Sequence, residues 1–318
     1  MFEPSRNRGV ALISVLLVVA ILLAVAANLM TRHSLVISQN QNTYSQNQAL
    51  QYALGAEALA RQVLFEDFST GGPEIDHFGE VWAQAVLPFE LDEGGFLEAQ
   101  VSDLQGCFNI NNVLGSGDAG LKQMRRLLIN LGVQPQIADG WKDWVDSDDT
   151  ITGFGAEDSE YLLAQVPHRT PNTLVTHTSE LRQLQNVTAE ELALVLPEVC
   201  ALPQSETRLN VNTAQVQALA ALDDAIAPGN LVALVEAERT YASVADFLTD
   251  YPDFQAVQAQ LSVTSEYFAL HAIAQVGDTS FTIYSQIHRD PNDGKITVLS
   301  RDFGKLFRSN VEVSTTDA

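Results

Sequence analysis

The sequence has little positive charge. Its 318 residues include 17 lysines and arginines against 40 aspartates and glutamates, which gives a formal net charge of −23. Such an acidic surface repels the phosphates of nucleic acids and anionic membrane surfaces, although solubility alone explains most acidic surfaces. The composition therefore argues against nucleic acid as a partner. Hydrophobic residues make up 46% of the chain, which is too apolar for a disordered protein.

Cysteine is also scarce. Cys107 and Cys200 are the two cysteines of the chain, too few for a disulfide scaffold, and neither lies in a CxxC motif. If the main body is exported, one long-range disulfide between them is expected. The alternative is two buried thiols that act as small hydrophobic side chains.

Recognisable catalytic motifs are missing. The sequence contains no HExxH, no GxSxG and no P-loop, and its histidines are scattered. A membrane-tethered periplasmic enzyme therefore has no candidate site to support it, and we predict that the protein is not an enzyme.

A long apolar run lies near the N-terminus. Every residue from Val10 to Ala27 is apolar except Ser14, and 18 helical residues span about 27 Å, enough to cross the hydrocarbon core of a bilayer. Arg6 and Arg8 precede the run, which favours a cytoplasmic N-terminus with the bulk of the chain on the far side. The following residues predict one continuous helix over residues 10–68.

Two kinds of pattern fill the rest of the chain. Alternating runs predict strands in FLEAQVSDLQ and in FTIYSQIHRDPNDGKITVLSRDF, the second a hairpin that turns at Asp293–Gly294. Between them, over about 110–265, the periodicity is helical. We therefore predict a helical domain inserted into a small α/β domain.

Acidic residues concentrate in DWVDSDDTITGFGAEDSEY. Carboxylates this dense repel one another unless a cation lies among them, and hard oxygen ligands suit Ca²⁺. The spacing resembles an EF-hand loop, but Ile151 stands where that loop requires glycine. The alternative is a solvated acidic helix end. We predict a Ca²⁺ site, with an undefined number of ions, from Asp143, Asp146, Asp148, Asp149, Glu157 and Asp158.

The segment RGVALISVLLVVAI resembles the class III signal of type IV pilins and pseudopilins. The resemblance implies that a prepilin peptidase cuts between Gly9 and Val10, removes residues 1–9, and leaves a methylated N-terminus on a retained helix. Ser14 is then the fifth mature residue, where most pilins carry a glutamate that pairs with the neighbouring subunit's terminal amine. A subunit with nothing above it needs no such carboxylate, so Ser14 suggests a tip position.

Five further segments, in the same order, resemble the K subunit of type II secretion systems, a minor pseudopilin: YALGAEALA, DLQGCFNINN, DWVDSDDTITGFGAEDSEYLL, LNVNTA and SEYFAL. The implied fold is α+β and pilin-like: a long N-terminal helix packs on a small antiparallel sheet and carries a large inserted α-helical domain. The implied organisation is a leader (1–9), the membrane and stem helix (10–68), two sheet-forming parts (69–109 and 266–318) and the insertion (110–265).

The resemblance also implies partners and a location. The implied partners are the I and J minor pseudopilins, other pseudopilins, the prepilin peptidase and the inner membrane, with secreted cargo as a further candidate. The protein would be a single-pass inner-membrane protein with its bulk in the periplasm. It would cap the pseudopilus, help to initiate it, and so support the export of folded proteins.

One segment favours an alternative function. The stretch that starts at LNVNTA resembles a helix-hairpin-helix unit, a module often used on DNA, which would suit a minor pilin of a type IV pilus or DNA-uptake system. Residues 204–250 nevertheless hold two bases against seven acids, so phosphate would be repelled. We expect this unit to be scaffold and expect no nucleic acid partner.

Overall fold

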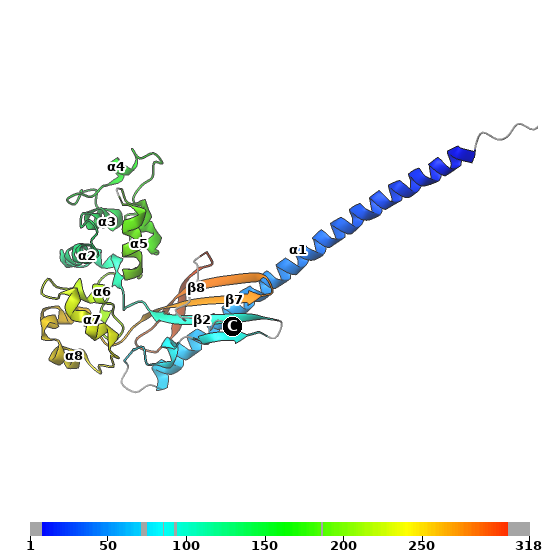
Figure 1. Cartoon of the computed structure of the whole chain (residues 1–318). Coiled ribbons are helices and arrows are strands. Elements are labelled where there is room, and N and C mark those ends of the chain that lie inside the picture. Colours follow the sequence, from blue (N-terminus) through cyan, green and yellow to red (C-terminus); the bar gives the residue numbers. More distant parts are fainter. Residues whose placement is uncertain (1–7, 71–74, 85, 92–93, 186, 305–318) are drawn as a thin grey trace, which may run out of the picture.

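The computed structural model describes residues 8–70, 75–84, 86–91, 94–185 and 187–304. Helix α1 (Arg8–Thr70) dominates it and extends away from the rest of the molecule (Figure 1). At 1.5 Å per residue its 63 residues measure about 95 Å. Every residue from Ala11 to Tyr44 is exposed. The helix predicted over residues 10–68 is therefore present. Its N-terminal half lies outside the folded part of the molecule, which consists of the sheet, the C-terminal half of α1 and a helical lobe and is called the head below.

The C-terminal half of α1 packs on a sheet through a stripe of small residues. Its buried positions recur every three or four residues, which places them on one helical face: Ala49, Ala53, Ala56, Ala60 and Leu64. Alanines along this face let the helix axis approach the strands closely. The same face buries Glu57, whose carboxylate accepts hydrogen bonds from Ser285 and from the Arg301 guanidinium at 2.6–2.8 Å.

The sheet is antiparallel, with the order β1-β2-β7-β8-β9. Its strands are β1 (Val86–Glu90), β2 (Gly95–Asp103), β7 (Tyr267–Val276), β8 (Thr279–Arg289) and β9 (Ile296–Asp302). The turn between β8 and β9 contains the predicted Asp293–Gly294, and Gly294 has φ +69°. In that left-handed region glycine avoids the penalty that other residues incur.

The chain between β2 and β7 forms a separate helical lobe (Figure 1). Its helices are α2 (Ala119–Asn130), α3 (Ile137–Val145), α4 (Asp158–Tyr161), α5 (Ala189–Val195), α6 (Val216–Ala220), α7 (Pro228–Glu236) and α8 (Val244–Asp250). The 3-10 segments η2 (Ile110–Leu114), η3 (Thr178–Gln183), η4 (Leu196–Glu198) and η5 (Pro252–Gln260) join them, and η1 (Val81–Ala83) precedes the sheet.

The lobe also contains short strands that helical periodicity could not predict. β3 (Phe108–Asn109) pairs in parallel with β4 (Val199–Cys200), and β5 (Leu209–Asn210) with β6 (Leu261–Ser262). The chain therefore leaves the main sheet at Asp103, before the boundary predicted at residue 109, because β3 pairs inside the lobe.

The head has two large hydrophobic cores. One lies between α1 and the sheet, and the other fills the lobe around residues such as Trp141, whose indole N–H donates to the Ile110 carbonyl at 2.9 Å. A third, small cluster lies where lobe and sheet meet and includes Leu104, Leu202 and Tyr267. At this junction Cys107 and Cys200 form a disulfide, with Cα atoms 5.9 Å apart, rather than two separate thiols.

Candidate functional site

The N-terminal half of α1 has the character of a membrane span. An 18-residue window within it has a mean hydropathy of 2.9, and none of that window is buried, so the helix is long and apolar enough to cross a bilayer. Ser14 lies exposed in this part. Gly9 and Val10 belong to the first turns of α1, whereas most of the predicted leader, residues 1–7, lies outside the described residues. Cleavage between Gly9 and Val10 stays a prediction.

Three of the six predicted calcium ligands converge in the acidic loop. Asp146 follows the end of α3, Asp148 lies in the loop, and Glu157 precedes α4; one carboxylate oxygen from each lies within 4.8 Å of the others. Glu157 is only 3% exposed. Its two carboxylate oxygens, and Oδ1 of Asp146, accept no hydrogen bond of normal geometry from the described residues. Buried acceptors without donors are costly, so these oxygens fit a cation.

Burial and mutual repulsion perturb this trio. Burial, and then the nearby carboxylates, raise the pKa of Glu157 to about 7. The same causes raise the pKa of Asp146 to about 6. Burial and mutual repulsion both disfavour the ionised form of these carboxylates when no counterion is near. A divalent cation among them would instead favour the ionised form and lower their pKa values.

The other three predicted ligands lie outside this trio and make other contacts. Asp143 accepts a hydrogen bond from the Thr152 N–H at 3.0 Å, and Asp158 pairs with Arg169 and accepts from the Thr170 N–H. Asp149 is exposed and lies outside the trio. These carboxylates therefore brace or border the loop, which the density of acidic residues alone could not predict.

Two glycines that the sequence interpretation overlooked shape the loop. Asp139 accepts from the Phe154 N–H at 3.1 Å and pairs with Arg125, so α3 presents Asp139 and Asp143 to the returning backbone. A Cβ on Gly153 or Gly155 would collide with a carboxylate oxygen of Asp139 or Asp143, respectively. The GFG sequence thus lets the loop close tightly over α3, which positions Glu157 near Asp146.

A second unpredicted feature is a buried polar network that joins the lobe to the sheet. Asp103, at the end of β2, accepts from the Ser265 hydroxyl at 2.6 Å, from Asn210 at 3.1 Å and from the Thr213 hydroxyl at 2.5 Å. Asn210 also donates to the Asp76 carbonyl at 3.0 Å. One network thereby connects the segment after α1, the end of β2, the LNVNTA segment and the start of β7.

Arg289 supplies the positive charge of this network. It pairs with both oxygens of Asp76 at 2.5 and 2.6 Å and with Asp67 at 3.0 Å, and it lies 4.8 Å from the ring centre of Phe268. Burial raises the pKa of Asp76 to about 7 against the opposing effect of Arg289. The guanidinium therefore compensates a carboxylate that is 1% exposed.

Comparison with known proteins places these features in a family. Residues 106–204 match a family model described as "Type II secretion system (T2SS), protein K". Protein K of Pseudomonas aeruginosa is 39% identical over 315 residues, covering 94% of this chain and 93% of that protein. The chain belongs to the protein K family of type II secretion systems. Protein K of Aeromonas hydrophila is 33% identical, covering 93% and 97%.

A solved member of the protein K family shares the fold. It is a chain of the GspK–GspI–GspJ complex from enterotoxigenic Escherichia coli, 28% identical to this chain with a TM-score of 0.74, and the match covers 85% of this chain and 99% of that one. This confirms the predicted α+β, pilin-like fold with an additional helical domain. The segment that matches the family model begins just before Cys107 and ends just after Cys200, the two cysteines that the disulfide joins, and it contains the acidic loop.

The LNVNTA segment is used internally in this protein K fold. Arg239 is buried and donates to the carbonyls of Val211 and Ala214 at 2.8 and 2.9 Å, while Asn212 donates to the Tyr241 carbonyl at 3.1 Å. Arg239 is one of the two bases of residues 204–250, so its charge is turned inward rather than toward a phosphate. This arrangement supports the scaffold interpretation.

A glycine pattern at the start of α2 also escaped the sequence interpretation. Gly115, Gly117 and Gly120 match GxGxxG, the pattern of dinucleotide-binding turns. The element before them is the 3-10 segment η2 rather than a strand, and the Glu206 carboxylate accepts the Ser116 N–H at 2.5 Å. A carboxylate at this turn disfavours phosphate, so the pattern does not indicate a nucleotide site.

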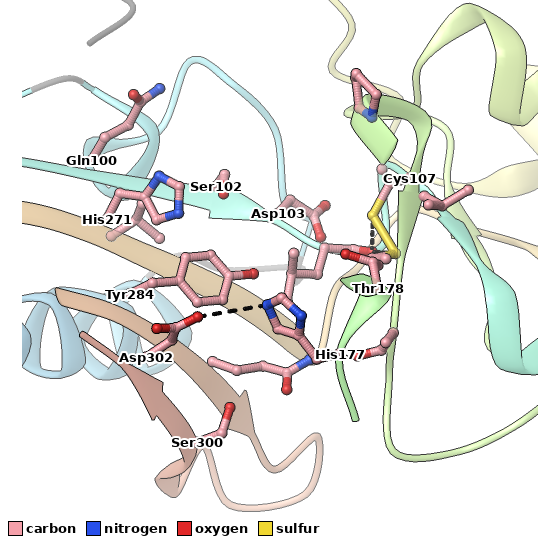
Figure 2. Close-up of a pocket in the computed structure, with 18 of the residues that line it drawn as sticks. Gln100, Ser102, Asp103, Cys107, His177, Thr178, His271, Tyr284, Ser300 and Asp302 are labelled. Carbon is pink, nitrogen blue, oxygen red and sulfur yellow. Dashed lines mark hydrogen bonds and ion pairs between the residues drawn. A yellow bond between two sulfur atoms is a disulfide. The ribbon is translucent and has the colours of Figure 1, made fainter. Parts of the chain in front are cut away.

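A groove of about 740 Å³ separates lobe and sheet, with the disulfide in its wall (Figure 2). A row across four strands lines it: Gln100, His271, Tyr284 and Asp302. His177 reaches over from the lobe, and its Nε2 lies 3.7 Å from Asp302. The Nδ1 atom of His177 accepts a hydrogen bond from the Ser179 N–H at 3.1 Å, so His177 caps η3. Among the described residues, the groove shows no arrangement of side chains typical of catalysis.

Proposed function

We propose that the protein is a minor pseudopilin at the tip of the type II secretion pseudopilus, required to initiate it and to export folded proteins across the outer membrane. One observation carries this proposal: α1 is a single helix whose exposed apolar half suits a membrane and whose alanine-lined half holds the head. Such a helix can leave the bilayer with the head attached. A structural role of this kind requires no catalytic site, so we propose that the protein is not an enzyme.

The proposed location is the inner membrane, crossed once. Arg6 and Arg8 favour a cytoplasmic N-terminus and a periplasmic head. A disulfide between Cys107 and Cys200 suits the oxidising periplasm. Prepilin peptidase would cut between Gly9 and Val10 and leave a methylated N-terminus.

The proposed position in the filament is the tip. Ser14 lacks the carboxylate that would pair with the terminal amine of a subunit above it, and its hydroxyl avoids the cost of a charged group within the apolar span. The lobe widens the head beyond the sheet and α1 (Figure 1), which suits a terminal subunit better than a repeating one.

The proposed partners are the I and J minor pseudopilins, because the solved Escherichia coli relative is in a complex with GspI and GspJ. Their contacts with this chain would run along the exposed part of α1 between residues 31 and 68. Within the described residues no observation favours the alternative of a type IV pilus or DNA-uptake pilin, and the buried Arg239 opposes it.

We also propose that the lobe binds Ca²⁺ through Asp146, Asp148 and Glu157. The buried oxygens of Glu157 and Oδ1 of Asp146, which accept no hydrogen bond of normal geometry from the described residues, support this assignment, and carboxylate oxygens are ligands that Ca²⁺ accepts. The ion would supply the charge that holds the three carboxylates together and would join the end of α3 to the start of α4. Its role would be structural.

Replacement of Gly9 by alanine in the native host tests the proposed function. We expect Gly9→Ala to retain its leader on an immunoblot and to lower secretion of type II substrates to the level of a deletion strain. Gly55→Ala is the matched control, because Gly55 lies in α1 with no neighbour that a Cβ would meet. Normal processing and secretion by Gly9→Ala would contradict the proposal.

A further inference from the structure

The end of the lobe around α4 carries unusually exposed apolar side chains. Leu163, Phe154 and Val166 are 88%, 80% and 76% exposed, more than any other large apolar side chain among the described residues, including those of the membrane-spanning part of α1. A folded head normally covers such groups, so their concentration in residues 151–166 marks an interaction surface. Figure 1 shows α4 and its adjoining loops at one end of the lobe, away from the N-terminal half of α1, so the bilayer that would hold the anchor does not cover them.

A cleft opens beside these side chains. It has a volume of about 420 Å³, and its apolar walls come from Ile137 of α3, from Phe154 of the acidic loop, and from Leu184 and Val187 after η3. Among the described residues that line the cleft, Glu160 of α4 alone carries a charge. Apolar walls with one carboxylate fit a side chain that has an aliphatic stem and a cationic head, as lysine and arginine do.

The Glu160 carboxylate is held in place and ionised. Its Oε2 accepts the Glu157 N–H at 3.1 Å and the Ser159 hydroxyl at 2.7 Å, as part of the capping box of α4. Hydrogen bonds from Ser159, and then from the Glu157 backbone, lower the pKa of Glu160, so its carboxylate is charged at neutral pH. A carboxylate can accept more hydrogen bonds than these two, so Glu160 keeps the capacity to pair with a cation.

The surroundings of the cleft are also acidic. Residues 146–166 contain six aspartates and glutamates and no lysine or arginine, and Arg169, which follows them, already pairs with Asp158. A divalent ion in the proposed cation site would still leave this segment negative. The segment therefore attracts a basic partner and repels an acidic one, including a second copy of this chain, whose net charge is −23.

We propose that the lobe tip, defined as the cleft at Glu160 with Leu163 and Val166 beside it, docks a second protein by taking one of its lysine or arginine side chains into the cleft. The stem of that side chain would lie against Phe154 and Ile137, and its charge would meet Glu160. Apolar side chains around it on the partner would cover Leu163 and Val166. Central anchors of this kind carry most of the binding energy in many protein interfaces. Such docking requires no bound Ca²⁺ and goes beyond the proposed function.

A designed binding partner tests this chemistry on the full-length chain. The probe is a small soluble helical bundle that presents one arginine among leucines, and matched probes replace the arginine with glutamine or glutamate, or the leucines with serine. The chain is held by α1 in nanodiscs of neutral phosphatidylcholine, and binding is measured by biolayer interferometry against empty nanodiscs. We expect the arginine–leucine probe to bind and each matched probe to bind more weakly by on the order of tenfold or more. High salt should weaken the binding, because part of the attraction is between charges.

Variants of this chain locate the binding. Glu160→Gln removes the charge but keeps a side chain suited to the capping box, so it should weaken binding of the arginine probe by on the order of tenfold and leave binding of the glutamine probe unchanged. Leu163→Ser should weaken binding of both probes by a similar factor, because an apolar contact is lost. Two matched controls should bind like the wild type: Glu236→Gln, on an exposed residue of α7, and Val81→Ser, on a residue that is 75% exposed in η1.

Several results would overturn docking at the lobe tip. Absence of binding by the arginine–leucine probe would do so, as would equal affinity for the arginine and glutamate probes. An equal loss in Glu160→Gln and Glu236→Gln would show that the cleft does not select the cation. Competition by free arginine as strong as that by the bundle would identify a small cation, rather than a protein, as the ligand. Self-association of the chain that Leu163→Ser abolishes would identify a second copy as the occupant.

Discussion

Removal of the Arg289 guanidinium is expected to destabilise the head strongly. Arg289 pairs with Asp76, which is 1% exposed, and with Asp67, so Arg289→Met leaves a buried carboxylate without its counter-charge. Breaking one partner of a buried pair typically costs about 3–5 kcal/mol. Urea unfolding of residues 31–318, which contain every buried position of the described chain, measures the free energy of unfolding.

Two variants test the cause of that loss. Arg169→Met removes an exposed partner of Asp158 and should cost far less stability than Arg289→Met, because water screens an exposed ion pair. Adding Asp76→Asn to Arg289→Met removes the stranded charge while an amide oxygen can still accept the Ser265 N–H, so part of the lost stability should return. A loss of under 1 kcal/mol for Arg289→Met, or no recovery in the double variant, would refute the reasoning.

The deficit of Arg289→Met should also depend on pH. Burial raises the folded-state pKa of Asp76 to about 7 from an ordinary value near 3.8, and the loss of Arg289 removes an effect that lowers it. A carboxyl that binds its proton more tightly in the folded state loses stability as pH rises from its unfolded pKa to its folded pKa. The deficit should therefore be larger at pH 8 than at pH 5.

Two further changes test the loop and the disulfide. Gly155→Ala should lower the free energy of unfolding by about 1–3 kcal/mol and weaken Ca²⁺ binding in calorimetry, because the new Cβ meets the Asp143 carboxylate. Gly140→Ala is the control and should be neutral, because a Cβ on Gly140 of α3 meets open space. Equal effects of the two substitutions would contradict this account. Replacing Cys107 and Cys200 with serine should lower the free energy of unfolding by about 2–5 kcal/mol in urea, whereas no change would mean that the disulfide does not hold the junction.

The main architecture could be predicted because its signals are local. A long apolar run continued without proline into α1, and alternation with a turn at Asp293–Gly294 predicted β8 and β9. Neither pattern depends on contacts between distant residues. The two-residue strands of the lobe were missed because they depend on distant contacts. Each strand pairs with residues about 50 to 90 positions away in the sequence, which come beside it only in the folded chain.

The sites were predicted only in part. The density of acidic residues located the loop, but it could not show that Asp143 would brace the backbone while Glu157 would be buried without a hydrogen bond of normal geometry to its carboxylate. The junction network left no sequence pattern at all. Arg289 lies 213 residues from Asp76, and each is a single polar residue whose role depends on the finished fold.

Reconstitution with purified I and J pseudopilins of the same secretion system tests the central claim most directly. The head, residues 31–318, is mixed with the corresponding heads of both partners, and the mass of the product is measured by light scattering during size-exclusion chromatography. A minor pseudopilin at the tip should form a stable complex that contains one copy of each chain. Separate elution of this chain in the presence of both partners would contradict the account.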